Sequence, residues 1–381
     1  MAMDRLFQLM KEKSASDMFF AVNSPVHIKI NGNLVPVNQQ KLENENILQL
    51  LGEICTPAQL EELETTSELN TGFSVPGTGR FRLSAFRQRG SISCVFRFVP
   101  ASIPALKDLG LPEVLSEIIM EKRGLLLLVG STGSGKSTTI AAMLDHRNEQ
   151  KSGHILTLED PIEYLFQNKK SIVNQREIGA DSKDFYTALR NSMRQAPDCI
   201  LIGEIRDKET MAAALAYAQS GHLVLATLHA NNSYNALNRI ISFYPIENRA
   251  ALLQDLSSTV KAIVSQRLIR SADGGKRTPA VEVLVNTRLI AEMIEKGEIG
   301  EIKEALEKSL SPGSQSFEQA LYRLFKEGKI SQEEALANAD SATNLLWLLN
   351  NASAEAKPAE GEKEPKPASA ETSFTEFTLN T

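Results

Sequence analysis

The chain has 381 residues, of which 42% are apolar, and its 41 basic and 47 acidic side chains give a net charge of −6 at pH 7. This length predicts two domains with a core in each. No run of Lys and Arg suggests a nucleic-acid-binding protein, and no segment reaches the ~18 consecutive apolar residues of a membrane span. The three cysteines, Cys55, Cys94 and Cys199, lie far apart and favour reduced thiols. We therefore expect a cytoplasmic protein with at most a peripheral membrane association.

Residues 1–100 have the pattern of an α+β domain. Apolar spacing predicts helices and strands, with Asn31-Gly32 as a hairpin turn. The expected helices cover 4–12, 43–51 and 57–63, and the expected strands cover 18–22, 26–30, 81–86 and 91–98. No catalytic cluster is visible here, but five arginines gather near the end: Arg80, Arg82, Arg87, Arg89 and Arg97.

Residues 101–111 predict an interdomain linker, because the stretch around them is rich in Pro and Gly. Residues 112–350 then carry apolar strands separated by helical patterns, which is typical of a parallel α/β sheet. The expected strands cover 125–129, 154–158, 172–174, 199–202, 222–228 and 280–285, and long helices are expected over 248–269 and 316–339. Residues 351–381, rich in Ala, Glu, Lys and Pro, predict a disordered tail.

The most informative segment follows the strand at 125–129 and precedes a helical pattern. It is a complete G-x-x-x-x-G-K-[ST] motif in the strand–turn–helix context that this motif requires. Glycines let backbone N–H groups approach phosphate oxygens, and the following helix N-terminus attracts anions. We expect a triphosphate site in which Lys136 binds the β- and γ-phosphates and Ser137 ligates Mg²⁺. The motif comprises Gly130, Ser131, Thr132, Gly133, Ser134, Gly135, Lys136, Ser137 and Thr138.

Two other predicted strands end in acids. Glu204 follows one of them, where a carboxylate of the Walker B type would hold Mg²⁺ or its waters. Glu159, Asp160 and Glu163 follow the other, and three clustered carboxylates repel one another unless a metal or an activated water compensates. The alternative for this second cluster is a solvated loop.

His222 and His229 bracket the strand at 223–228. Their spacing does not put both side chains on one strand face, so a shared metal site is disfavoured. We predict that they form sensor hydrogen bonds to the phosphates, and ordinary hydrogen bonding within the fold is the alternative.

Together these motifs resemble the PilT/PilU group of type IV pilus twitching-motility ATPases, within the secretion-ATPase superfamily. The similarity runs from about residue 14 to about residue 345 and rests on Walker A at 130–139, an Asp box at 155–164, an atypical Walker B at 196–207 and a His box at 220–245. Segments 228–232, 316–322 and 338–342 are most similar to the PilU branch. Ala291 and Glu295 stand where the PilT signature has arginines, which fits an accessory retraction motor better.

The resemblance implies a PAS-like N-terminal domain, a RecA-like ATPase domain and a ring-shaped homohexamer under the inner-membrane platform protein, with a PilT-type retraction ATPase as partner. It implies that ATP and Mg²⁺ bind the P-loop and that Arg82 and Arg97 reach the nucleotide when the domains close around the linker. Our mechanistic hypothesis is that Glu204 orients Mg²⁺ through water, and that Glu163, or else Glu159, positions the attacking water.

Three alternatives remain open. An assembly or secretion ATPase of the same superfamily usually carries a tetracysteine metal site, which this sequence lacks. A regulatory subunit that binds ATP and hydrolyses little would fit the changed positions Ala291 and Glu295. A nucleic-acid translocase is the third, because many RecA-like rings act on nucleic acids.

Overall fold

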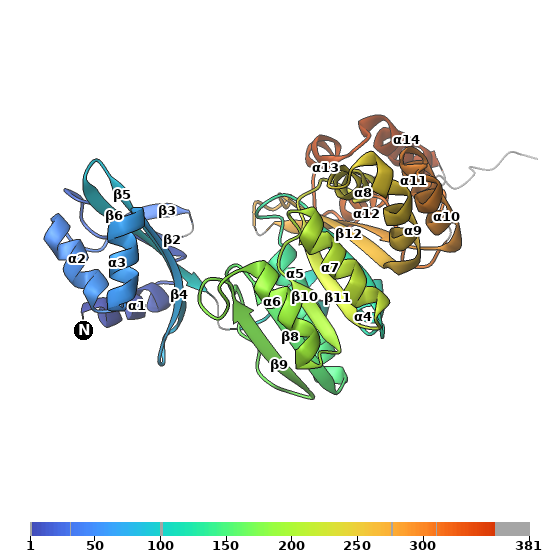
Figure 1. Ribbon diagram of the computed structural model, residues 1–381. Helices are drawn as coiled ribbons and strands as arrows, with labels where there is room; N and C mark the ends of the chain where they lie inside the picture. Colours follow the sequence, from blue (N-terminus) through green and yellow to red (C-terminus); the bar gives the residue numbers. More distant parts are fainter. Residues whose placement is uncertain (1, 31, 100–101, 276, 310, 355–381) are drawn as a thin grey trace, which may run out of the picture.

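The computed structural model describes residues 2–30, 32–99, 102–275, 277–309 and 311–354, and Figure 1 shows their arrangement. The first part of the chain folds into a six-stranded antiparallel sheet in the order β3-β2-β1-β6-β5-β4. Its strands are β1 (Asp17–Phe20), β2 (His27–Ile30), β3 (Asn33–Pro36), β4 (Glu68–Val75), β5 (Gly79–Gln88) and β6 (Ser91–Val99). Its helices are α1 (Ala2–Glu12), α2 (Asn44–Gly52) and α3 (Pro57–Thr66).

The three helices pack on one face of this sheet, because each has an apolar stripe that needs a partner surface. In α1 the stripe is Met3, Phe7 and Met10, all buried. Strand β5 alternates in the same way, with Phe81 and Leu83 inward. The alternate residues of β5, among them its first two arginines, therefore lie on the opposite face of the sheet.

The second sheet has seven strands in the order β13-β12-β7-β11-β10-β8-β9. All neighbours are parallel except β13, which runs antiparallel to β12, so the predicted α/β class is confirmed. The strands are β7 (Gly124–Val129), β8 (Gly153–Glu159), β9 (Ser171–Glu177), β10 (Cys199–Ile202), β11 (Leu223–Leu228), β12 (Val260–Ile269) and β13 (Thr278–Val285).

Helices cover both faces of this sheet, which is why all six residues of β7 are buried. One core contains residues of α6 (Phe185–Ser192), α7 (Lys208–Gln219), α8 (Ser233–Ser242) and α9 (Arg249–Thr259). The other contains residues of α4 (Val114–Ile118) and α5 (Lys136–Gln150). The C-terminal helices are α10 (Arg288–Lys296), α11 (Ile302–Glu307), α12 (Phe317–Lys326), α13 (Gln332–Asn338) and α14 (Ala342–Ala354).

Both long helices predicted for this part are wrong in extent. The segment 248–269 is a helix only as far as Thr259, and it continues as β12, because Val260–Ile269 pairs with both β7 and β13. The segment 316–339 is two helices, because Gly328, with φ of +68°, follows the end of α12 and Ser331 caps α13.

Two predicted segments, the linker and the tail, overlap with helices of the structure. The short 3₁₀ helix Leu106–Leu109 lies inside the expected linker, and Leu106 and Leu111 pack against the core that contains α4 and α5. The expected tail from residue 351 begins within α14, which extends to Ala354, and residues 355–381 lie outside the described residues.

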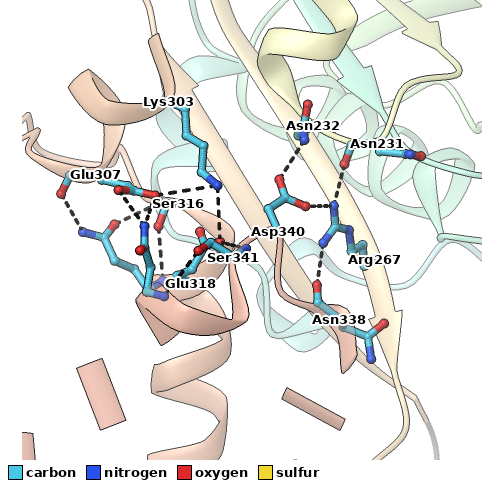
Figure 2. A network of polar contacts seen from close by, with 12 residues as sticks. Asn231, Asn232, Arg267, Lys303, Glu307, Ser316, Glu318, Asn338, Asp340 and Ser341 are labelled. Carbon is cyan, nitrogen blue, oxygen red and sulfur yellow. Dashed lines mark hydrogen bonds and ion pairs between the residues drawn. The ribbon is translucent and has the colours of Figure 1, made fainter. Parts of the chain in front are cut away.

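A polar network attaches the C-terminal helices to the sheet (Figure 2). Arg267 of β12 forms an ion pair with Asp340, and its guanidinium also donates to the carbonyl oxygens of Asn231 and Asn338. The Nδ2 atom of Asn232 donates to the second oxygen of Asp340 at 2.7 Å. The network therefore joins the loop after β11 to the α13–α14 connection.

Candidate nucleotide-binding site

The P-loop connects the carboxyl end of β7 to the start of α5, as predicted. Three of its glycines have positive φ: +154° at Gly130, +77° at Gly133 and +90° at Gly135. A Cβ on Gly130 would lie 2.6 Å from the carbonyl oxygen of Gln266, and one on Gly135 would lie 2.7 Å from Nε2 of the same residue. The loop is therefore pressed against β12, and only glycine fits this path.

Polar groups in the loop are arranged to receive an anion. The Lys136 ammonium donates to the carbonyl oxygens of Gly130 and Ser131 at 2.7 and 3.0 Å, which holds it over the loop. Burial lowers the pKa of Lys136, and the nearby carboxylates of Glu204 and Glu163 oppose that shift. The buried hydroxyl of Ser134 has no hydrogen-bond partner within the described residues, so it can bond to a phosphate oxygen.

A cavity of about 720 Å³ opens beside this loop, and both parts of the chain line it. Thr132, Gly133, Gly135, Lys136, Ser137 and Thr138 contribute from the P-loop and α5. The strand ends contribute Glu159, Glu163, Glu204 and His229, and the N-terminal sheet contributes Arg97. This volume suits a nucleotide, and the predicted residues from three strand ends meet here because parallel strands end at one edge.

Glu204 lies two residues after β10 and is held on both sides. His229 Nε2 lies 3.1 Å from its Oε1, and Arg206 Nε donates to its Oε2 at 2.7 Å. The hydrogen bond to Glu204 is also the main reason that the pKa of Arg206 is raised. These contacts fix the direction of the carboxylate toward the cavity.

The Asp-box acids differ in their surroundings. Glu159 is engaged by Thr157 Oγ1 at 2.6 Å and Gln175 Nε2 at 3.1 Å, and burial raises its pKa. Glu163 is exposed and lines the cavity. Both candidate bases line the cavity, but Glu163 is the more exposed of the two, so its carboxylate is the more accessible to a water there.

The donor set around the cavity suits Mg²⁺ held largely by phosphate oxygens. No cluster of three or more His, Cys, Asp or Glu side chains that could hold a metal exists within the described parts of the chain. Mg²⁺ commonly keeps several waters and binds one or two protein groups plus substrate phosphates. The hydroxyl of Ser137 and the oriented carboxylate of Glu204 fit that requirement.

The two arginines carried over from the family resemblance occupy opposite positions on neighbouring strands. Arg82 of β5 and Arg97 of β6 are direct cross-strand partners, so they lie on the same face of the sheet. Arg97 lines the cavity and donates through Nε to Asp17 at 2.8 Å. Arg82 is not among the described residues that line it. Two positive charges directly opposite one another on a sheet repel, so an anion bound near this face would stabilise the pair Arg82 and Arg97.

The structure brings only one of the two histidines to the cavity. His222 precedes the first residue of β11, at the end of the strand opposite to His229. Its Nδ1 atom is 3.1 Å from both Ser220 Oγ and the Tyr217 carbonyl oxygen. His222 does not line the cavity within the described residues, so its predicted sensor contact with the phosphates stays a prediction without support from this geometry. The alternative, a histidine hydrogen-bonded within the fold, describes it.

Sequence reasoning missed four residues near the site. Arg206 and Arg277 line the cavity, and the Tyr164 hydroxyl is 2.9 Å from Thr138 Oγ1. Arg80, so far noted only as one of five clustered arginines, is largely buried and ion-paired with Glu177 at the end of β9. Arg206 and Tyr164 belong to motif segments already noted, whereas no local signal marks Arg80 or Arg277.

Comparisons with known proteins now place this geometry in a family. The sequence model described as type II/IV secretion system protein matches residues 2–315. The chain belongs to this family. It is 45% identical over 349 residues to the type IV pilus ATPase PilU of Pseudomonas aeruginosa, covering 92% of this chain and 91% of that protein. It is also 37% identical over 345 residues to the pilus retraction ATPase PilT of that organism, covering 91% and 100%.

The fold of the family is shared as well. The crystal structure of the pilus retraction motor PilT with bound ADP superposes with a TM-score of 0.84 at 37% identity, covering 90% of this chain and 99% of that chain. The Legionella pneumophila ATPase DotB superposes with a TM-score of 0.78 at 26% identity, covering 92% and 96%. None of the helices in the described ranges is long and apolar enough to cross a membrane.

Proposed function

We propose that this chain is an ATP-hydrolysing, PilU-like motor of type IV pili, homologous to the PilT retraction motor. Family membership and the close relatives support the ATPase activity. The observation that carries the proposal is the convergence of Lys136, Glu163 and Glu204 on one cavity that Arg97 of the N-terminal sheet also lines. ATP occupies this cavity in the proposed mechanism.

The P-loop binds the triphosphate. Its backbone N–H groups, the Lys136 ammonium and the Ser134 hydroxyl surround the phosphate oxygens, and Lys136 exchanges its bonds to loop carbonyls for bonds to phosphate. Ser137 and, through water, Glu204 would hold Mg²⁺, which would supply positive charge to the phosphate oxygens. Arg206 and His229 keep the Glu204 carboxylate aimed at that position.

Glu163 positions the attacking water and accepts its proton, while the half-buried Glu159, which Thr157 and Gln175 hold, supports the loop. Arg97, and Arg82 after domain closure, neutralise charge in the transition state. Arginines placed in this way contribute ~10³-fold or more to the rate of phosphoryl transfer, so closure of the two domains controls hydrolysis.

We further propose a PAS-like domain at 1–100, a linker at 101–111 and a RecA-like domain at 112–350 that assemble as a homohexamer. The ring acts in the cytoplasm beneath the inner-membrane platform protein, together with a PilT-type ATPase. An accessory role is supported by α10, where Ile290 and Ile294 are buried but Glu295 is exposed. The departure from the PilT signature at Glu295 therefore alters the surface available to partners and leaves the core unchanged.

ATP turnover of purified variants tests this proposal. We expect Lys136→Ala and Glu204→Ala to lower kcat by at least tenfold, and Glu163→Gln to lower it by ~10²-fold, since it removes the base. Lys170→Ala, an exposed lysine outside the cavity lining, is the control. Wild-type rates in Lys136→Ala or Glu204→Ala would contradict the assignment.

A second ATP-turnover experiment distinguishes the proposed motor from the alternative, a regulatory subunit that binds ATP and hydrolyses little. Turnover is measured for this chain alone, for a PilT-type motor alone and for their mixture. If this chain binds ATP but adds no turnover of its own, and Lys136→Ala leaves the rate of the mixture unchanged, it regulates and does not hydrolyse.

A further inference from the structure

An ion pair connects the N-terminal sheet to the second domain beside the site. Arg80 Nη2 of β5 donates to Oε2 of Glu177, the last residue of β9. The two side chains are only 15% and 5% exposed. The backbone of β4 covers the pair, since a Cβ on Gly72 would lie 2.6 Å from Arg80 Nη2 and 2.8 Å from Glu177 Oε1. Such close coverage distinguishes this pair from an ordinary surface ion pair.

The same carboxylate oxygen of Glu177 also binds the segment 159–164 at the end of β8, called here the acid loop. The backbone N–H of Ile162, between Pro161 and Glu163, donates to Glu177 Oε2 at 3.1 Å. Two other residues at the end of β9 also bond to this loop: Ile178 N–H to the Glu159 carbonyl oxygen at 2.9 Å, and Gln175 Nε2 to the Tyr164 carbonyl oxygen at 2.8 Å. Of these three attachments, the one through Glu177 is shared with the N-terminal sheet.

We propose that Arg80 and Glu177 are positioning residues that make the geometry of the acid loop depend on the N-terminal domain. A buried carboxylate needs a cationic partner, so the ion pair with Arg80 compensates the burial of Glu177 and holds its side chain in place. Glu177 in turn holds the Ile162 N–H and thereby the position of Glu163 at the cavity. Neither Arg80 nor Glu177 lines the cavity within the described residues, so both act through the loop and not on the nucleotide.

This inference rests on the proposed role of Glu163, and its test therefore includes a measurement that does not depend on hydrolysis. Hydrogen–deuterium exchange is followed at the amide of Ile162 in the full chain without nucleotide. We expect Arg80→Ala to raise that exchange rate at least tenfold. Arg87→Ala, an exposed arginine on the same strand, should leave it unchanged.

Steady-state kinetics supply the second measurement. Arg80→Ala should lower kcat on the order of tenfold and leave KM for ATP within about twofold, because small misplacement of a catalytic group costs rate and not binding. Arg80→Lys should recover part of the rate by restoring the charge. The double variant Arg80→Ala/Glu177→Gln should be no worse than the poorer single variant, since the two residues act as one unit.

The outcomes separate the two proposals. Unchanged Ile162 exchange in Arg80→Ala overturns the positioning role, whether or not the wild type hydrolyses ATP. Raised exchange with an unchanged kcat in an active wild type overturns the link to catalysis alone, and an inactive wild type overturns the proposed function. If Arg80→Ala does not fold, the same two measurements are made on Glu177→Gln and compared with Arg80→Lys. Glu177→Gln keeps an oxygen acceptor for the Ile162 N–H but loses the charge.

Discussion

Substitution of Arg267 is expected to destabilise the C-terminal region, because this one side chain links β12 to the last helices (Figure 2). Its guanidinium pairs with Asp340, donates to two carbonyl oxygens and lies 3.9 Å from the ring centroid of Phe317. The side chains of Arg267 and Asp340 are 22% and 10% exposed. Arg267→Ala removes all of these contacts and leaves a largely buried carboxylate.

The expected cost follows from these contacts. Breaking a buried ion pair by removing one partner costs about 3–5 kcal/mol, and a partly desolvated cation–π contact adds ~1 kcal/mol. The residual exposure of Arg267 and the remaining bond from Asn232 to Asp340 at 2.7 Å reduce this total. We therefore expect Arg267→Ala to lower the free energy of unfolding of the C-terminal region by about 3 kcal/mol.

The single tryptophan, Trp347, lies in α14 and reports on this region. Urea denaturation followed by its fluorescence gives the change in unfolding free energy. Arg288→Ala is the control, since Arg288 is 95% exposed and, among the residues that the structure describes, forms its ion pair with Glu292 one turn away, a contact worth about 0.3–0.5 kcal/mol. A loss below about 1 kcal/mol in Arg267→Ala, or one equal to the control, would refute this reasoning.

Two further predictions concern buried and strained positions. Burial raises the pKa of Glu282, so its contribution to stability is full below about pH 4.5 and is lost as pH rises through the elevated native value. Glu282→Gln, which keeps an acceptor for the Ser233 N–H, should therefore lose less stability between pH 5 and 8 than the wild type in urea midpoints; an equal loss would contradict this. Gly135→Ala should cost more than about 1–2 kcal/mol, because its Cβ would also lie 2.7 Å from Gln266 Nε2, and should weaken ADP binding in calorimetry. Gly328→Ala, with φ of +68° and free space around it, should cost about 1–2 kcal/mol without affecting ADP. Equal ADP affinities in the two variants would refute that distinction.

How much the sequence predicted depended on the range of the interactions involved. The P-loop is local, because its glycines, lysine and flanking strand occupy one continuous segment. The helix predicted over 248–269 was wrong from Val260 onward, because β12 is specified by pairing with β7, more than a hundred residues earlier. Strand β4 was missed because it is an edge strand in which most positions are partly or fully exposed, and so it lacks clear alternation.

The same distinction applies to the site. Motif spacing identified Glu159, Glu163 and Glu204 together, and the preference for Glu163 over Glu159 as the base was a hypothesis. The bonds from Thr157 and Gln175 that distinguish Glu159 depend on the folded loop, so the sequence does not show them. The ion pair of Arg80 with Glu177 joins residues 97 positions apart, so no sequence window contains it.

The position of Arg97 suggests how the N-terminal domain meets the nucleotide. Asp17 engages Arg97 only through Nε, and a guanidinium has five N–H donors, so other donors remain for a phosphate oxygen. Asp17 is itself buried, and the ion pair with Arg97 supplies the cationic partner that its carboxylate needs. Arg97 can therefore bind phosphate without breaking its existing ion pair. Leu106 and Leu111 pack against the core that contains α4 and α5, so the domain closure that we propose would leave the chain from Leu106 onward in place.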